Sequence, residues 1–262
     1  MQVLFPCPSS SQEQRIRYNP YMNRAKHTQI FAHRGANKEA VENTRVAFDK
    51  ALVYAIDGIE TDVQLSRDEI SVLWHDRFLI RLGLPDKHID DFDCSQLQAM
   101  SKGADILTLR DFLDAYRKRC RLLIEIKNRE WEPVTRHEIK VRQTLDMIGA
   151  TADDTIMASS FNLASLMYAQ KIRPGFPLIY NFETEQTLAD ARRALADHPF
   201  LHGLCLPIEN LNEDMVNLLR EHSKCIAVYT CNSDEEINKA LQLKVDILIS
   251  DVPQKALHIR NA

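Results

Sequence analysis

Apolar runs of strand length alternate with segments of helical periodicity along most of the chain, which limits the fold to few architectures. The apolar runs fall at 29–33, 58–64, 121–126, 154–159, 176–181, 203–207, 225–231 and 245–249. The helix-period segments between them cover 43–54, 108–118, 135–148, 162–171, 184–196, 213–222 and 234–243. Strands that alternate with helices in this way predict an α/β protein with a parallel sheet.

Eight predicted strands that alternate with helices over roughly 230 residues match a closed (β/α)₈ TIM-like barrel. The alternative is an open doubly wound sheet, which usually has roughly five to seven strands and often a glycine-rich first turn. This chain has only seven glycines and no glycine motif for a nucleotide phosphate. The sequence therefore favours the barrel.

A short strand-like run at Ile70–Trp74 follows the second barrel strand, and the segment 77–107 separates it from the next predicted helix. This pattern predicts a short βα-loop insertion on the C-terminal face, where barrel active sites lie. We expect residues 1–28 to form an arm and residues 29–262 to form the barrel domain. Helix starts are expected at Asn43 or Thr44, at Thr108, and at Ser233 or Asp234.

The composition argues against several classes of partner. A formal charge of −4 gives no electrostatic signature for binding nucleic acid or an anionic membrane. The six cysteines are scattered without a CxxC spacing, which favours reduced thiols over a zinc site or a disulfide framework. We see no signal peptide and no apolar run of transmembrane length, so we expect a cytoplasmic protein without a stable membrane anchor. The oligomeric state is left open.

Carboxylates recur on two neighbouring predicted strands. Glu60 and Asp62 share one face of their strand, and Glu125 stands in the same relation on the next barrel strand. Solvated acids at a strand end are the simpler alternative. A buried and unpaired carboxylate would be costly in so apolar a run. Ligation of one hard divalent cation through oxygen explains the pattern better.

Histidines and cations accompany these carboxylates. His33 ends the first strand, and Arg34 offers a guanidinium suited to phosphate, followed by a glycine that permits a tight turn. His75 has Asp76 beside it as a candidate to orient the ring, although adjacent strand side chains usually diverge. Lys127 could pair with Glu125 or reach a phosphate oxygen, and its spacing favours neither. Together with a cation, these groups indicate metal-assisted attack on a phosphodiester.

Several motifs resemble those of the glycerophosphodiester phosphodiesterases. They are Phe31-Ala-His-Arg-Gly35, Glu42-Asn-Thr44, Gly58-Ile-Glu-Thr-Asp-Val63, Val72-Leu-Trp-His-Asp76 and Leu123-Ile-Glu-Ile-Lys127. Later stretches agree at Ser159-Ser-Phe-Asn162, Tyr229-Thr-Cys-Asn232 and Asp246-Ile-Leu-Ile-Ser-Asp-Val-Pro253. The resemblance runs from about Gln29 to Pro253, with the motifs in the order of the family. No single motif is specific, but the complete set is.

The resemblance implies a TIM-like barrel that binds one Mg²⁺ or Ca²⁺ and hydrolyses glycerophosphodiesters to glycerol 3-phosphate and an alcohol. It implies an acid/base pair in His33 and His75, metal ligands in Glu60, Asp62 and Glu125, phosphate contacts in Arg34 and Lys127, and pocket residues in Phe161 and Tyr229. Tyr229 stands where the family often has Trp, which leaves the head group open. A lysophospholipase D and a barrel that binds phosphodiesters without turnover are the alternatives.

Overall fold

Parallel strands form a closed ring, because the first strand pairs with both the second and the last. The computed structural model describes residues 27–101, 106–129, 131–149 and 155–262. In it His33 is in register with Glu60 of the second strand, and Ala32 with Ser250 of the last. The eight barrel strands are β1 (Gln29–His33), β2 (Gly58–Leu65), β6 (Arg121–Ile126), β7 (Ile156–Ser160), β8 (Leu178–Asn181), β9 (Gly203–Pro207), β10 (Cys225–Tyr229) and β11 (Ile247–Ser250). The predicted (β/α)₈ barrel is confirmed.

Alternating side chains fill two apolar layers, one inside the ring and one beneath the helices. The inner layer consists of Phe31, Leu123, Met157, Ile179, Cys205, Ala227, Ile247 and Ile249. Ile30 and Ala32 point the other way and join the larger outer layer. A Cβ atom at Gly58 would lie 2.4 Å from the Phe31 ring. The absence of a side chain at Gly58 therefore makes room for the ring that fills the barrel beside it.

Helices cover the outside of the ring and begin mostly where the sequence predicts a cap. At the predicted starts, the side chains of Thr44, Thr108 and Ser233 each accept a hydrogen bond from the backbone three residues on. The helix predicted from residue 184 starts later, because Thr187 caps it and forms a capping box with Asp190. The helices are α1 (Arg45–Val53), α3 (Leu109–Tyr116), α4 (Val134–Ile148), α5 (Leu163–Ile172), α6 (Leu188–Asp197), α7 (Glu213–Glu221), α8 (Asp234–Gln242) and α9 (Pro253–Asn261). The sequence pattern did not predict α9.

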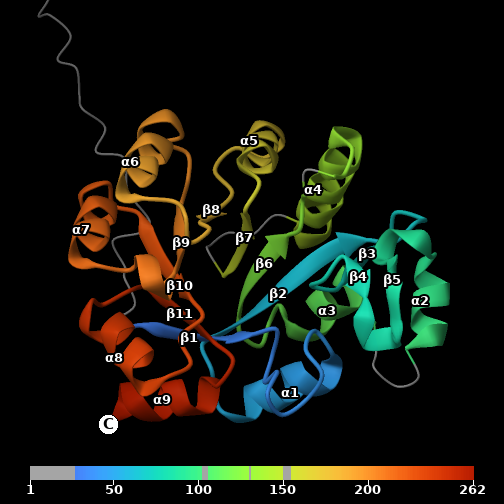
Figure 1. Ribbon diagram of the computed structural model, residues 1–262, viewed down its shortest axis with the longest axis horizontal. Helices are drawn as coiled ribbons and strands as arrows, with labels where there is room; N and C mark the ends of the chain where they lie inside the picture. The colour runs from blue at the N-terminus through green and yellow to red at the C-terminus, as the bar shows by residue number, and fades with distance from the viewer. Residues whose placement is uncertain (1–26, 102–105, 130, 150–154) are drawn as a thin grey trace, which may run out of the picture.

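The predicted insertion is present, and it has more structure than the loop that we expected. Its elements are β3 (Ser71–Leu73), β4 (Phe78–Leu79), β5 (Leu84–His88), α2 (Cys94–Met100) and two 3₁₀ turns, η2 (Ile80–Leu82) and η3 (Ile89–Asp91) (Figure 1). β3 lies antiparallel to β2, and β4 pairs with β5. A separate apolar cluster supports them, formed by Val72, Trp74, Leu79, Ile89, Cys94, Leu97 and Ile106. The expectation of no helix between 77 and 107 was wrong, because Asp93 and Gln96 form a capping box for the short α2.

The residue just before β1 is attached to the barrel by a side-chain hydrogen bond. The Thr28 hydroxyl donates a hydrogen bond to the Val245 carbonyl at 2.8 Å. The rest of the expected arm, up to residue 26 and including Cys7, lies outside the described residues. Among the described cysteines, Cys94, Cys120, Cys205 and Cys231 carry free thiols. Within the described ranges, no helix combines the length and the apolarity needed to cross a membrane, and the cytoplasmic location stays a prediction.

The packing of α1 against α3 can be tested with Phe48. Its fully buried ring lies 4.8 Å from the Phe112 ring and 5.4 Å from the Tyr116 ring between centroids. Phe48→Ala should therefore lower the free energy of unfolding by about 3–5 kcal/mol. Val53→Ala on the same helix, where the side chain is 80% exposed, should change it by less than about 0.5 kcal/mol. Urea denaturation checks both, and equal effects would contradict this packing.

Candidate active site

The parallel register brings three carboxylates together on the inner face of the barrel. Glu60 and Asp62 share one face of β2, and Asp62 is in register with Glu125 of β6. Carboxylate oxygens of the three residues lie within 4.8 Å of one another, and all three residues are buried. The structure therefore forms the cluster that strand alternation predicts.

Two cations contact this cluster directly. Lys127 Nζ lies 3.0 Å from Asp62 Oδ1 and 2.7 Å from Glu125 Oε1. Arg34 Nε lies 3.1 Å from Asp62 Oδ2 on the other side. Burial would raise the pKa of Asp62, but the charges of Lys127 and Arg34 outweigh it and hold the pKa below its ordinary range. Lys127 thus makes the carboxylate pairing that its spacing allowed, and its ammonium also lines the pocket described below.

Glu60 is the least compensated member of the cluster. Its Oε2 is buried and has no hydrogen-bond partner among the described residues, and His33 Nε2 is 3.9 Å away. Burial and the neighbouring charge of Asp62 raise the pKa of Glu60 well above its ordinary value. Three ionised carboxylates facing two cations would leave one negative charge uncompensated. An all-oxygen donor set with an orphaned buried oxygen fits a hard divalent cation.

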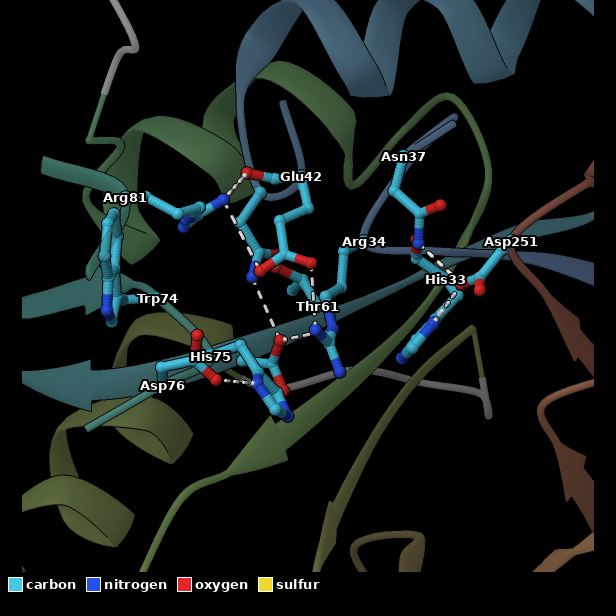
Figure 2. A network of polar contacts seen from close by, with 12 residues as sticks. His33, Arg34, Asn37, Glu42, Thr61, Trp74, His75, Asp76, Arg81 and Asp251 are labelled. Carbon is cyan, nitrogen blue, oxygen red and sulfur yellow. Dashed lines mark hydrogen bonds and ion pairs between the residues drawn. The ribbon is translucent and has the colours of Figure 1, made fainter. Parts of the chain in front are cut away.

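His33 is held by a carboxylate from the far end of the chain. Its Nδ1 donates to Asp251 Oδ1 at 2.6 Å, just beyond the end of β11. Asn37 Nδ2 donates to the same oxygen at 2.6 Å, and Asn232 Nδ2 donates to Asp251 Oδ2 at 2.9 Å. Burial would raise the pKa of Asp251, but the bonds from His33 and Asn37 hold it below its ordinary range. Asp251 therefore fixes the ring, with Nε2 on its free side (Figure 2).

His75 is oriented in the same manner by its own neighbour. Its Nδ1 donates to Asp76 Oδ1 at 2.7 Å, so the adjacent side chains meet despite the usual divergence on a strand. The turn that carries them is fixed by Gln64, whose Nε2 donates to the carbonyls of Trp74, His75 and Asp76. Burial lowers the pKa of His75, despite the attraction of Asp62. A neutral imidazole with Nε2 free is suited to accept a proton.

The turn after β1 presents Arg34 to the cluster. Arg34 has a φ of 56° and Gly35 a φ of 85°, and a Cβ at Gly35 would lie 2.6 Å from the Ala47 backbone. Glycine is therefore required there, as the sequence predicted. Glu42 Oε2 accepts a hydrogen bond from Arg34 Nη1 at 2.9 Å, so one guanidinium contacts Glu42 and Asp62 at once.

A pocket of about 260 Å³ opens on these groups. Both histidines, both cations, Glu60 and Glu125 line its floor, and Phe161 and Tyr229 form an aromatic wall. The two aromatic rings meet edge to face with 6.0 Å between centroids. The Tyr229 hydroxyl donates to the Phe182 carbonyl at 2.5 Å. Arg129 and Glu183 lie on the outer part, with Arg129 Nη1 3.8 Å from Glu183 Oε1.

Sequence reasoning about single residues named Asp76 as a candidate partner of His75, but it missed Asp251 and Asn43. Asp251 follows the last barrel strand, and several candidate site residues also stand at strand ends, but its motif served only to support the family resemblance. Asn43 was considered only as a helix start, yet its Nδ2 donates to Asp62 Oδ2 at 2.9 Å. Its Oδ1 accepts from Thr61 at 2.8 Å. These partners are far apart in sequence, so only the fold reveals them.

Known proteins can now be compared with this geometry. Residues 33–255 match the glycerophosphoryl diester phosphodiesterase family. The glycerophosphodiester phosphodiesterase of Bacillus altitudinis is 28% identical over 248 residues, which cover 89% of this chain and 98% of that protein. The Thermotoga maritima glycerophosphodiester phosphodiesterase structure gives a TM-score of 0.75 at 26% identity, covering 90% and 100% of the two chains. An Oleispira antarctica phosphodiesterase, solved with the product sn-glycerol-3-phosphate, gives 0.78 at 24% identity, covering 90% and 98%.

The matched range includes both histidines, the three clustered carboxylates and the two cations that contact them. The match extends over most of the chain and confirms the resemblance that the motifs suggested. It also confirms that the barrel is that of an enzyme. The chain belongs to the glycerophosphoryl diester phosphodiesterase family.

Proposed function

We propose that this protein hydrolyses glycerophosphodiesters to glycerol 3-phosphate and an alcohol, with one Mg²⁺ or Ca²⁺ held by Glu60, Asp62 and Glu125. The observation that carries the proposal is the buried carboxylate cluster, of which Glu60 and Glu125 line the same pocket as both oriented histidines. Membership of the family supports the substrate class. The name of the Bacillus altitudinis relative and the product bound to the Oleispira antarctica phosphodiesterase agree with it.

Proton transfer is assigned to the two histidines. Asp251 and Asp76 each occupy Nδ1 of one ring, so Nε2 is the atom that exchanges protons with the substrate. One histidine takes a proton from the attacking hydroxyl or water, and the other gives one to the leaving alkoxide. Where the glycerol 2-hydroxyl attacks, a cyclic phosphate precedes hydrolysis.

Charge stabilisation is assigned to Arg34 and Lys127. Both cations border the pocket floor beside the carboxylates, where they can bind the phosphoryl oxygens as negative charge gathers there. When bound, the divalent ion supplies Lewis-acid polarisation and lowers the pKa of a coordinated hydroxyl. Phe161 and Tyr229 pack against the carbon atoms of the substrate and leave the polar floor to its phosphate.

The direct test is a coupled assay for glycerol 3-phosphate with a panel of glycerophosphodiesters (choline, ethanolamine, inositol and glycerol head groups). We expect release from at least one of them in the presence of Mg²⁺ or Ca²⁺. Phosphodiester binding by the metal-loaded protein without any turnover would instead support the non-catalytic barrel.

Metal dependence follows from the uncompensated carboxylates. Chelator-treated protein should lose activity and regain it with Mg²⁺ or Ca²⁺. Either ion should also raise the melting temperature. At a free ion concentration 100 times the Kd, binding adds about 2.7 kcal/mol to the free energy of unfolding. Glu125→Gln should reduce this shift, because a neutral amide binds the ion more weakly. Full activity in thoroughly demetallated protein would refute the metal assignment.

The volume of the pocket predicts the size of the preferred substrate. Its volume of about 260 Å³ is below the ~300–1,000 Å³ usual for larger ligands, so it suits a deacylated substrate. We expect a higher kcat/KM for glycerophosphocholine than for lysophosphatidylcholine, measured with the same choline-release assay. The reverse order would favour the lysophospholipase D alternative.

The acid/base assignment can be separated from a structural role. His33→Ala and His75→Ala should lower kcat by roughly 10²–10⁴. Both side chains line the pocket, so the melting temperature should change by only a few degrees. His222→Ala, at an exposed position after α7, should change neither quantity. Wild-type turnover in both site variants, or loss of activity only through unfolding, would overturn the assignment.

A further inference from the structure

A guanidinium from the insertion reaches the loop that follows β1. Arg81 lies in η2, and its Nη1 donates to the Glu42 carbonyl at 3.1 Å. The same nitrogen lies 3.4 Å from Glu42 Oε1. The Arg81 guanidinium also stacks 4.0 Å from the centroid of the Trp74 ring (Figure 2). Arg81 is thus fixed by an aromatic face and two oxygen atoms of a single residue.

Glu42 divides its carboxylate between two arginines. Oε1 faces Arg81, and Oε2 accepts a hydrogen bond from Arg34 Nη1 at 2.9 Å. Because each guanidinium has its own oxygen, Arg34 does not compete with Arg81 for Glu42. The contacts form a continuous chain from the Trp74 ring through Arg81 and Glu42 to Arg34 (Figure 2).

Arg34 needs the contact with Glu42 because its other contact, with Asp62, competes with the phosphate for the guanidinium. Its Nε already lies 3.1 Å from Asp62 Oδ2, within the carboxylate cluster. With Nη1 released, the guanidinium would be drawn further onto the carboxylates and away from the pocket. Glu42 holds Nη1 at 2.9 Å and so limits this movement of the guanidinium.

We propose that Arg81 is a positioning residue, which fixes Glu42 so that Glu42 holds Arg34 in the orientation that binds the substrate phosphate. This inference rests on the proposed function for the role of Arg34. It gives the insertion a task in phosphate binding. It also explains why the insertion has its own apolar cluster, since Trp74 belongs to that cluster and supports the Arg81 guanidinium.

The first test is Arg81→Met in the metal-loaded protein. We expect kcat/KM for the best glycerophosphodiester to fall roughly 5- to 30-fold, the effect of one to two kcal/mol. The affinity for inorganic phosphate, measured by calorimetry, should fall by a similar factor. Arg81→Lys should recover part of the loss, because it keeps the charge without the planar fork. Arg34→Met is the reference for complete loss of the phosphate contact.

Arg67→Met is the matched control. Arg67 also ties the insertion together, with Nη2 2.9 Å from Asp93 Oδ2. Its other polar contacts in the described part of the chain are with Asp91 and Gln96, not with Glu42. It should leave phosphate affinity and kcat/KM unchanged. A similar loss in both variants would assign Arg81 to general support of the insertion and overturn the proposal.

A double-mutant cycle separates action through Glu42 from an independent effect. Arg81→Met combined with Glu42→Gln should lose no more phosphate affinity than Glu42→Gln alone. Losses that multiply, or wild-type phosphate affinity in Arg81→Met or Arg34→Met, would overturn the proposal. Calorimetry with inorganic phosphate tests Arg81 even without turnover. A wild-type protein that binds phosphate but cleaves no glycerophosphodiester would overturn the proposed function alone.

Discussion

The site depends on an imbalance of buried charge. Glu60, Asp62 and Glu125 are placed together by strand register, and the described cations that touch them are Arg34 and Lys127. Burying an unpaired carboxylate is expensive, so the remaining negative charge requires a proton or a metal. The raised pKa of Glu60, caused by burial and by Asp62, shows where that requirement is greatest. A cluster of this kind contributes little to stability, and its value lies in what it can bind.

The groups around the cluster share one principle of construction. His33, His75 and Arg34 are each held by a carboxylate from outside the cluster, namely Asp251, Asp76 and Glu42. In each case the carboxylate takes one nitrogen and leaves another facing the pocket. Such anchoring reduces the number of orientations that the reactive group must lose on substrate binding. Rigid strands therefore place the carboxylates, and loops orient the groups that we propose to act on the substrate.

The sequence predicted what depends on local pattern. Strand alternation placed Glu60 and Asp62 on one face, and the recurrence at Glu125 added the neighbouring strand. It could not predict the partner of His33, because Asp251 lies 218 residues away and the two meet only when β1 pairs with β11. Of the insertion, the strand-like run at 70–74 predicted β3, whereas β4, β5 and α2 were missed because they are short. The family resemblance gave the roles of the residues, which neither periodicity nor spacing could assign.

The support of Lys127 shows how far the organisation of the site extends into the barrel wall. The Lys127 carbonyl accepts a hydrogen bond from Lys140 of α4, whose fully buried ammonium lies 2.9 Å from Glu132 Oε2. Burial lowers the pKa of Lys140 to about 8, against the attraction of Glu132. A buried ion pair of this kind is a poor source of stability compared with apolar packing. Its clear structural effect is to fix the backbone at the end of β6, from which the Lys127 side chain reaches Asp62 and Glu125. The charge that balances the cluster is thus itself held in place by a second buried charge pair behind it.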